Sequence, residues 1–258
     1  MRQIEVSLFD HPGRDHHLLY NGLADVMDAD RDLTANGRGA VLDDLIDVIR
    51  AHALQNVAGV RLLHKHCDIA ADEIMVEQEA EENDAPVLAT RPEPFRRLGR
   101  RVAPNSYRFL AEQIQPVEYS DDPVVHDAAA DLLARRDFLN EFAAALDRRG
   151  MSDTLGLMVA PRSFYDRPAP AGRPLLVESS YEVSRANVVR YHATHEFDPD
   201  KLLQTVWMAS DSLLAASCPT LCSMKCTPTG LCVEDDYGKH GPVLGHDKSH
   251  PKPHWNAP

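Results

Sequence analysis

The spacing of apolar and polar residues along the chain predicts three helices. Across residues 38–54, apolar side chains recur at the three- and four-residue intervals that form one face of an α-helix. A second helix is predicted over residues 122–149, with Pro123 suited to its first turn and Gly150 placed to end it. A third is predicted from residue 199 to about 215, where leucines and a valine again share one face.

Five short segments rich in β-branched and apolar residues predict strands between these helices. They cover residues 60–66, 74–79, 155–159, 175–181 and 187–192. Because several follow one another at hairpin-like spacing, an antiparallel or mixed sheet fits better than a βαβ series. The expected fold class is therefore α+β, with this sheet packed against about three helices. The stretches 79–94 and 166–174 are rich in proline, alanine and charge, and we expect them to be exposed loops.

Length and composition are those of a globular protein. The 258 residues are 43% hydrophobic and 26% charged, and no window holds the roughly 18 consecutive apolar residues that span a bilayer. We expect an α+β main domain at residues 1–217 and an irregular Cys/His-rich segment at 218–258 that packs on it or extends from it. The first ten residues lack the apolar region of a secretory signal, which favours a cytoplasmic protein with no membrane partner.

The charge distribution argues against nucleic acid as a partner and leaves room for a small anion. The formal net charge is −13, whereas duplex affinity comes mainly from basic residues that neutralise phosphates. Residues 91–108 nevertheless contain six arginines against the single acid Glu93. The ordinary interpretation is a solvated strand or helix. The functional alternative is an anion site, because guanidinium groups bind carboxylate or phosphate through paired hydrogen bonds; its members would be Arg96, Arg97, Arg100 and Arg101.

The C-terminal segment concentrates groups that bind transition metals. It contains four of the five cysteines, which are Cys218, Cys222, Cys226 and Cys232. Thiolates and imidazoles are ligands for zinc and iron, so we predict a structural zinc held by three or four of these thiolates, with His240 as a further candidate ligand. The spacing matches neither a zinc ribbon nor a ferredoxin. Free or disulfide-bonded cysteines are the alternative to a metal site.

A second candidate metal site follows the apolar run at residues 60–63. Alternate residues of a strand share a face, so His64 and His66 would point the same way and could bind one metal. The next predicted strand carries Glu73 and Glu77. If the two strands pair, one of these carboxylates would complete a face of two histidines and one carboxylate with open positions on the metal. The alternative is a pair of histidines on the wet face of an edge strand.

Other histidines are weaker candidates. His192, His195 and Glu196 follow a predicted strand, but their spacing fits neither of the helical zinc motifs H-E-x-x-H and H-x-x-E-H. A sheet that brought His192 near His64 and His66 would give a site of three imidazoles. Near the start of the chain, we expect a loop with surface positions for His11, Asp15, His16 and His17.

Two function classes follow from these patterns. The first is an intracellular metal-dependent enzyme, with His64, His66 and Glu77 at a zinc or iron ion and Arg100 orienting a small anionic substrate. The second is a non-catalytic metal-binding or thiol redox-sensing protein that uses the C-terminal cysteines. The chain lacks the G-x-G-x-x-G, G-x-x-x-x-G-K-[ST] and G-x-S-x-G signatures, which disfavours dinucleotide, P-loop and α/β-hydrolase chemistry. The reaction and the oligomeric state do not follow from the sequence.

Overall fold

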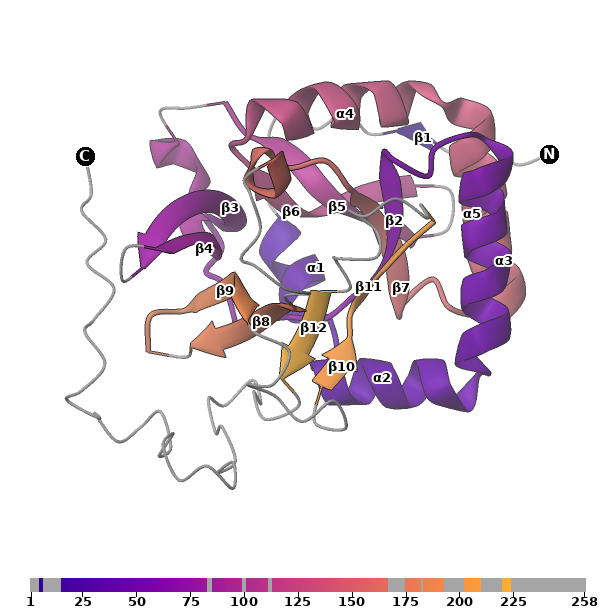
Figure 1. Ribbon diagram of the computed structural model, residues 1–258, viewed down its shortest axis with the longest axis horizontal. Helices are drawn as coiled ribbons and strands as arrows, with labels where there is room; N and C mark the ends of the chain where they lie inside the picture. The colour runs from indigo at the N-terminus through magenta and orange to yellow at the C-terminus, as the bar shows by residue number, and fades with distance from the viewer. Residues whose placement is uncertain are drawn as a thin grey trace.

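The structure is a computed structural model with a mixed α+β architecture. It describes residues 5–6, 15–82, 85–98, 101–110, 113–166, 175–181, 183–192, 202–209 and 220–223. Within these residues, a mixed sheet curls into a half-barrel with helices along several of its sides (Figure 1). The predicted α+β class and mixed sheet are confirmed, although the described residues form five α-helices where three were predicted. None of those helices has the length and hydropathy needed to cross a membrane.

Helices and strands follow one another in runs along the chain. The helices are α1 (His16–Asn21), α2 (Val26–Ala35), α3 (Arg38–Ala51), α4 (Pro123–Ala134) and α5 (Arg136–Arg149), with 3-10 turns η1 (Phe95–Arg97) and η2 (Ser163–Asp166). The strands are β1 (Glu5–Val6), β2 (Ala58–Leu62), β3 (Glu73–Glu82), β4 (Ala85–Pro94), β5 (Ala103–Leu110), β6 (Gln113–Ser120), β7 (Leu155–Val159), β8 (Leu175–Tyr181), β9 (Ala186–His192), β10 (Leu202–Gln204), β11 (Val206–Met208) and β12 (Thr220–Ser223).

The order of the strands nearly closes the sheet on itself. It runs β10-β12-β8-β9-β4-β3-β6-β5-β7-β2-β11, with β1 attached to β6. The two terminal strands of this order, β10 and β11, are joined in the chain by the single residue Thr205. Thr205 is buried, and its carbonyl accepts the Leu62 N–H at 2.8 Å. One residue therefore connects the two ends of the sheet.

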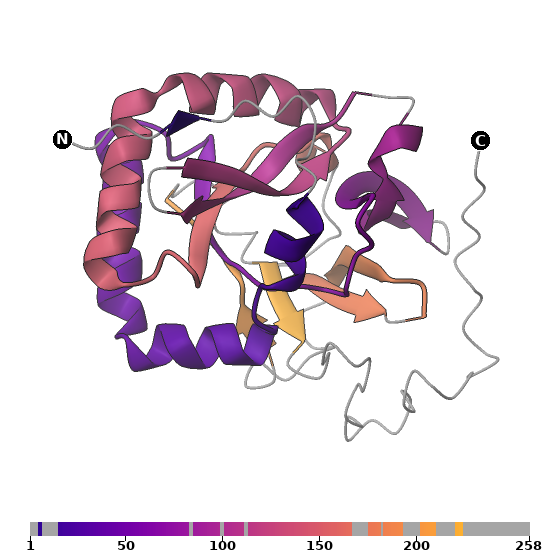
Figure 2. The same cartoon turned by 180° about the vertical axis from the view of Figure 1, so that it is seen from behind.

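The largest apolar core lies between the sheet and helices α3, α4 and α5. Its members include Leu45 and Ile49 from α3, Phe138 and Phe142 from α5, and Leu157 from β7. α3 and α5 lie side by side, while α4 runs along the adjoining side of the sheet (Figure 1). From behind, α1 is seen in front of the strands, where it contacts β3 and β6 (Figure 2). Helices therefore cover the sheet from more than one side.

Two of the three predicted helices differ from the structure. The range 38–54 is confirmed as α3, but the range 122–149 divides at Arg135 into α4 and α5. A single helix of that range would be about 40 Å long, and the break lets α4 contact β5 and β7 while α5 packs against α3. Gly150 ends α5 with a left-handed backbone, as predicted.

The predicted third helix, at residues 199–215, is wrong where the structure describes it. Residues 202–204 and 206–208 are the strands β10 and β11 instead. β10 pairs with β12, and β11 pairs with β2, so each satisfies the backbone groups of an otherwise exposed strand. Tertiary pairing therefore outweighs a local apolar spacing that fits a helix as well as a strand.

The predicted loop at residues 79–94 is also wrong, because this stretch forms most of a long hairpin. β3 and β4 pair in continuous register from Glu73 opposite Pro94 to Glu82 opposite Ala85. β9 pairs with β4 only at residues 88–90. The prolines of β4 lie outside this paired stretch, on an edge that has no partner strand among the described residues. Proline is tolerated there because it has no backbone N–H to donate to a neighbouring strand. The predicted loop at 166–174 lies outside the described residues except for Asp166, which ends η2.

Candidate metal centre

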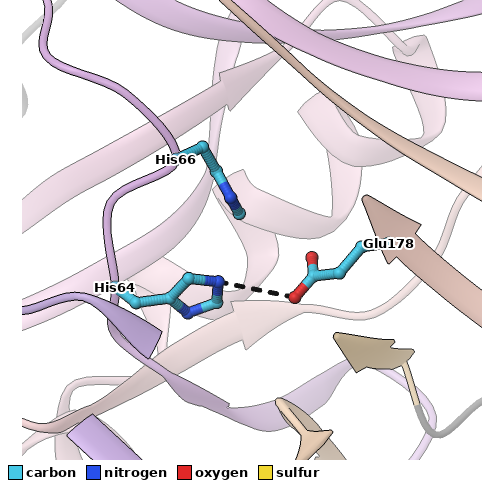
Figure 3. A group of neighbouring side chains, drawn as sticks. All are labelled: His64, His66 and Glu178. Carbon is cyan, nitrogen blue, oxygen red and sulfur yellow. Dashed lines mark ion pairs between the residues drawn. The ribbon is translucent and has the colours of Figure 1, made fainter. Parts of the chain in front are cut away.

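Two histidines and one glutamate converge inside the half-barrel. His64 and His66 follow the end of β2, and Glu178 lies in the middle of β8. Their side chains point toward one another (Figure 3). Each offers one ligand atom, and these atoms lie within 4.8 Å of one another. All three residues are buried, with exposed fractions of 4%, 5% and 3%.

The position of Thr205 explains how residues so far apart in sequence meet. β2 pairs with β11, and β10 is linked through β12 to β8. The turn from β10 to β11 therefore brings the strand of Glu178 beside the end of β2. The Thr205 hydroxyl donates a hydrogen bond to Glu178 Oε1 at 2.9 Å, while the Thr205 carbonyl accepts the N–H of Leu62. The closure of the sheet thus positions both sides of the site.

The hydrogen bonding of His64 leaves one ring nitrogen available as a ligand. Nδ1 lies 2.9 Å from the Leu62 carbonyl oxygen, which can only accept, so Nδ1 carries a proton. In the neutral ring, Nε2 then has a free lone pair. This atom lies 3.4 Å from Glu178 Oε1, but the contact lacks the geometry of a hydrogen bond. A ring held through Nδ1 by a carbonyl is the usual arrangement of a metal-binding histidine.

His66 lies against the same centre but has more polar neighbours. Its ring meets that of His64 edge to face, with centroids 4.7 Å apart. Its Nδ1 lies 3.2 Å from Ser180 Oγ, and its Nε2 lies 3.3 Å from Glu118 Oε1 and 3.4 Å from Arg61 Nη2. Burial lowers the pKa of His66, and the neighbouring Glu118 only partly opposes this. The ring is therefore neutral near pH 7, as a metal ligand must be.

Glu178 is held ionised although it is buried. Burial alone would raise the pKa of its carboxyl, but the close contact with His64 and the nearby Arg61 guanidinium hold that pKa well below its usual range. Thr205 donates to one carboxylate oxygen, and Asn187 Nδ2 donates to the other at 3.3 Å. These donors fix the orientation of the carboxylate without supplying a full positive charge.

A second buried carboxylate is already neutralised by an arginine. Glu118 Oε2 lies 2.8 Å from Arg61 Nη1, and both residues are buried. Burial would raise the pKa of Glu118, yet Arg61 together with the contacts to His66 and His64 outweighs this effect and lowers the pKa to about 2. The pair Arg61–Glu118 therefore carries no net charge, and the charge of Glu178 is the one that a cation could balance.

The geometry fits a divalent transition metal. Two ligands on a tetrahedral metal with bonds of about 2.1 Å lie about 3.4 Å apart, which matches the separation of His64 Nε2 and Glu178 Oε1. Imidazole and carboxylate are ligands that zinc and iron share. Three protein ligands leave at least one coordination position for water or a substrate. The group could therefore hold a metal ion.

The carboxylates predicted for this site are engaged elsewhere. The strand pairing on which the Glu77 site depended does not form, because β2 pairs with β7 and β11 while β3 pairs with β4 and β6. Glu77 is buried against the Arg162 guanidinium. Glu73 lies 2.6 Å from Arg185 Nη2. Among the described residues, Glu178 occupies the place that Glu73 or Glu77 was expected to fill.

Most of the other predicted site residues are not described by the structure. Outside the described residues lie Arg100, His195, Glu196, Cys218, Cys226, Cys232 and His240. The backbone of Cys222 lies in β12, in register with Glu178 on one side and Leu203 on the other. Arg96 is exposed in η1 over the Phe95 ring, and His192 ends β9 outside the group of His64, His66 and Glu178.

The sequence carried a signal for the residues that pattern reasoning missed. Arg61, Glu118 and Glu178 each interrupt an otherwise apolar or uncharged strand segment, and a buried charge in such a place needs a partner. Glu178 lay inside a strand that was predicted with the correct bounds. Its partner could not be identified without the sheet order.

Comparisons with known proteins add no family to this picture. Neither the protein-family models, nor the curated proteins, nor the solved structures contain a match to this chain.

Proposed function

We propose that this protein is a metal-dependent enzyme whose zinc or iron ion is held by His64, His66 and Glu178. The observation that carries the proposal is His64 Nε2, which has no hydrogen-bond partner among the described residues and faces Glu178 Oε1 at 3.4 Å inside a buried site. When the His64 ring is neutral, these two atoms are both lone-pair acceptors and repel each other. A divalent cation between them replaces that repulsion with two coordinate bonds.

The balance of buried charge supports an anionic substrate. Arg61 offsets Glu118, and Arg162 offsets Glu77, so the negative charge left in the group is that of Glu178. A divalent ion with neutral histidines would make the sum of these charges +1. That excess attracts an anion to the open coordination position, where a metal supplies Lewis-acid activation of a bound oxygen. The small anionic substrate expected from the sequence is therefore retained, with Arg61 in place of Arg100 as the nearby guanidinium.

Metal content tests the proposal. The untagged protein, purified without chelators and then incubated with Zn²⁺ or Fe²⁺, is expected to contain about one ion per chain. His64→Ala and Glu178→Gln should each lose most of it, because each removes one of three ligands. His52→Ala is the matched control, since His52 lies 2.8 Å from Glu141 in a histidine–glutamate pair far more exposed than the candidate centre. A protein that takes up no ion, or equal uptake by all variants, would contradict the proposal.

One further variant separates the two predicted metal sites. Cys226→Ser removes a member of the C-terminal cysteine set and leaves His64, His66 and Glu178 intact. We expect its metal content to equal that of the wild type. Loss of the ion in this variant, with retention in His64→Ala, would assign the metal to the cysteines and favour the non-catalytic alternative.

A further inference from the structure

Several buried polar atoms of the centre and of the strands β5 and β6 lack hydrogen-bond partners among the described residues. Three of them are His64 Nε2, Glu118 Oε1 and Ser106 Oγ, and the others belong to Asn105, Arg108, Gln115 and Tyr119. The metal proposed above would bind to His64 Nε2. Glu118 Oε1 lies 3.3 Å from His66 Nε2, at the edge of the same centre. Ser106 Oγ has no such explanation.

Ser106 lies on the same face of the sheet as Glu118. It belongs to β5, in register with Glu118 of β6 on one side and Met158 of β7 on the other. Directly paired residues of neighbouring strands project to the same face. The β5–β6 pairing shifts register on both sides of Ser106, and such irregularities often re-aim side chains beside functional sites. The Ser106 hydroxyl thus leaves the sheet beside the carboxylate that borders the centre.

An unpartnered hydroxyl at this position is costly. Ser106 has an exposed fraction of 0%, and a buried polar group without a partner costs about 1–3 kcal/mol. Alanine would fill nearly the same volume without that cost. A serine here is therefore explained best by a ligand that supplies the missing acceptor.

We propose that Ser106 donates a hydrogen bond to a small carboxylate bound at the open position of the metal. The inference rests on the proposed function. The net charge of +1 at the loaded centre selects a monoanion, and a carboxylate has two oxygens, one for the metal and one for the Ser106 hydroxyl. The site is enclosed by buried residues, which favours a substrate with a compact carboxylate end.

Formate binding to the cobalt-substituted protein tests this assignment. Co²⁺ in place of the native ion gives visible absorption bands that change when an anion binds. We expect formate to shift these bands in the wild type and Ser106→Ala to weaken the formate affinity about tenfold, which corresponds to one hydrogen bond to a charged group. Neutral formamide should bind far more weakly than formate.

Ser120→Ala is the matched control. Ser120 is also buried in this sheet, but its hydroxyl already accepts the N–H of Asp122 at 3.2 Å. Equal formate affinities in the wild type and Ser106→Ala would overturn the role of Ser106, as would cobalt bands in the wild type that formate does not change. An absence of cobalt bands in the wild type would instead contradict the proposed metal centre.

A second readout separates ligand binding from a structural role. Without metal and ligand, Ser106→Ala should melt at the same temperature as the wild type or higher, because it removes an unpartnered hydroxyl. Ser120→Ala should melt lower, because it removes an acceptor that is used. A clear loss of stability in Ser106→Ala would show that the hydroxyl serves the fold and would overturn the inference.

Discussion

Single buried histidines differ in what surrounds them, and this decides what each can do. His66 lies among Glu118, Arg61 and His64, whereas His16 in α1 meets the edge of the Tyr119 ring, with centroids 5.6 Å apart. His16 was expected at the surface, but it is buried, and burial followed by the charge of His17 lowers its pKa to about 4. With no carboxylate ion-paired to it among the described residues, His16 acts as a packing residue.

We predict that His16 makes the protein less stable as the pH falls. Below about pH 6.5 the unfolded chain takes up a proton at this imidazole, while the folded chain resists it until about pH 4. The unfolded state is therefore favoured increasingly across this window. Between pH 7 and pH 4.5 the wild type should lose about 2–3 kcal/mol more unfolding free energy than His16→Phe, as measured by urea denaturation. Parallel pH curves for the two proteins would contradict the prediction.

At the residue scale, sequence reasoning named two of the three residues of the candidate centre. His64 and His66 were expected to share a face of one strand, but β2 ends at Leu62, and their rings meet in the segment that follows it. Their partner could not be predicted in this way, because Glu178 comes from a strand more than 100 residues later in the chain. The nearer Glu77 was chosen on an assumed strand pairing, and the structure pairs it with Arg162 instead.

At the scale of elements, the strands that matter most for the site are the least visible in the sequence. β10 and β11 have three residues each and are separated only by Thr205. Their apolar spacing also fits a helix. They form strands because β12 and β2 each offer an edge with which they can pair. The elements α3, β7 and β8 were predicted with nearly correct bounds because their apolar patterns favour one interpretation.

A pair of glycine substitutions tests the packing of the elements around the site. A Cβ on Gly156 of β7 would collide with the Tyr107 carbonyl oxygen and lie 2.7 Å from Leu63 Cδ2, next to His64. We expect Gly156→Ala to destabilise the protein by at least about 2 kcal/mol. Gly39 in α3 has open space around it, so Gly39→Ala should be neutral or stabilise by about 0.5–1 kcal/mol. Urea denaturation measures both, and similar effects of the two changes would contradict this packing.

At the scale of the whole molecule, the candidate centre joins the two ends of a curled sheet. His64 and His66 follow β2, the second-last strand in the order, while Glu178 lies in β8, the third from the other end. Thr205 connects the two ends of the sheet covalently through the chain. A metal bound to His64, His66 and Glu178 would connect them a second time by coordination. The fold therefore brings a buried carboxylate to two imidazoles that local sequence had already placed together.

The local structure of a bound metal tests this account most directly. X-ray absorption at the zinc edge of the zinc-loaded protein should show nitrogen and oxygen neighbours at about 2.0–2.1 Å, with the outer-shell scattering of two imidazole rings. No sulfur shell should appear near 2.3 Å. A sulfur shell would place the metal on the C-terminal cysteines, and the absence of imidazole scattering would remove His64 and His66 from the site.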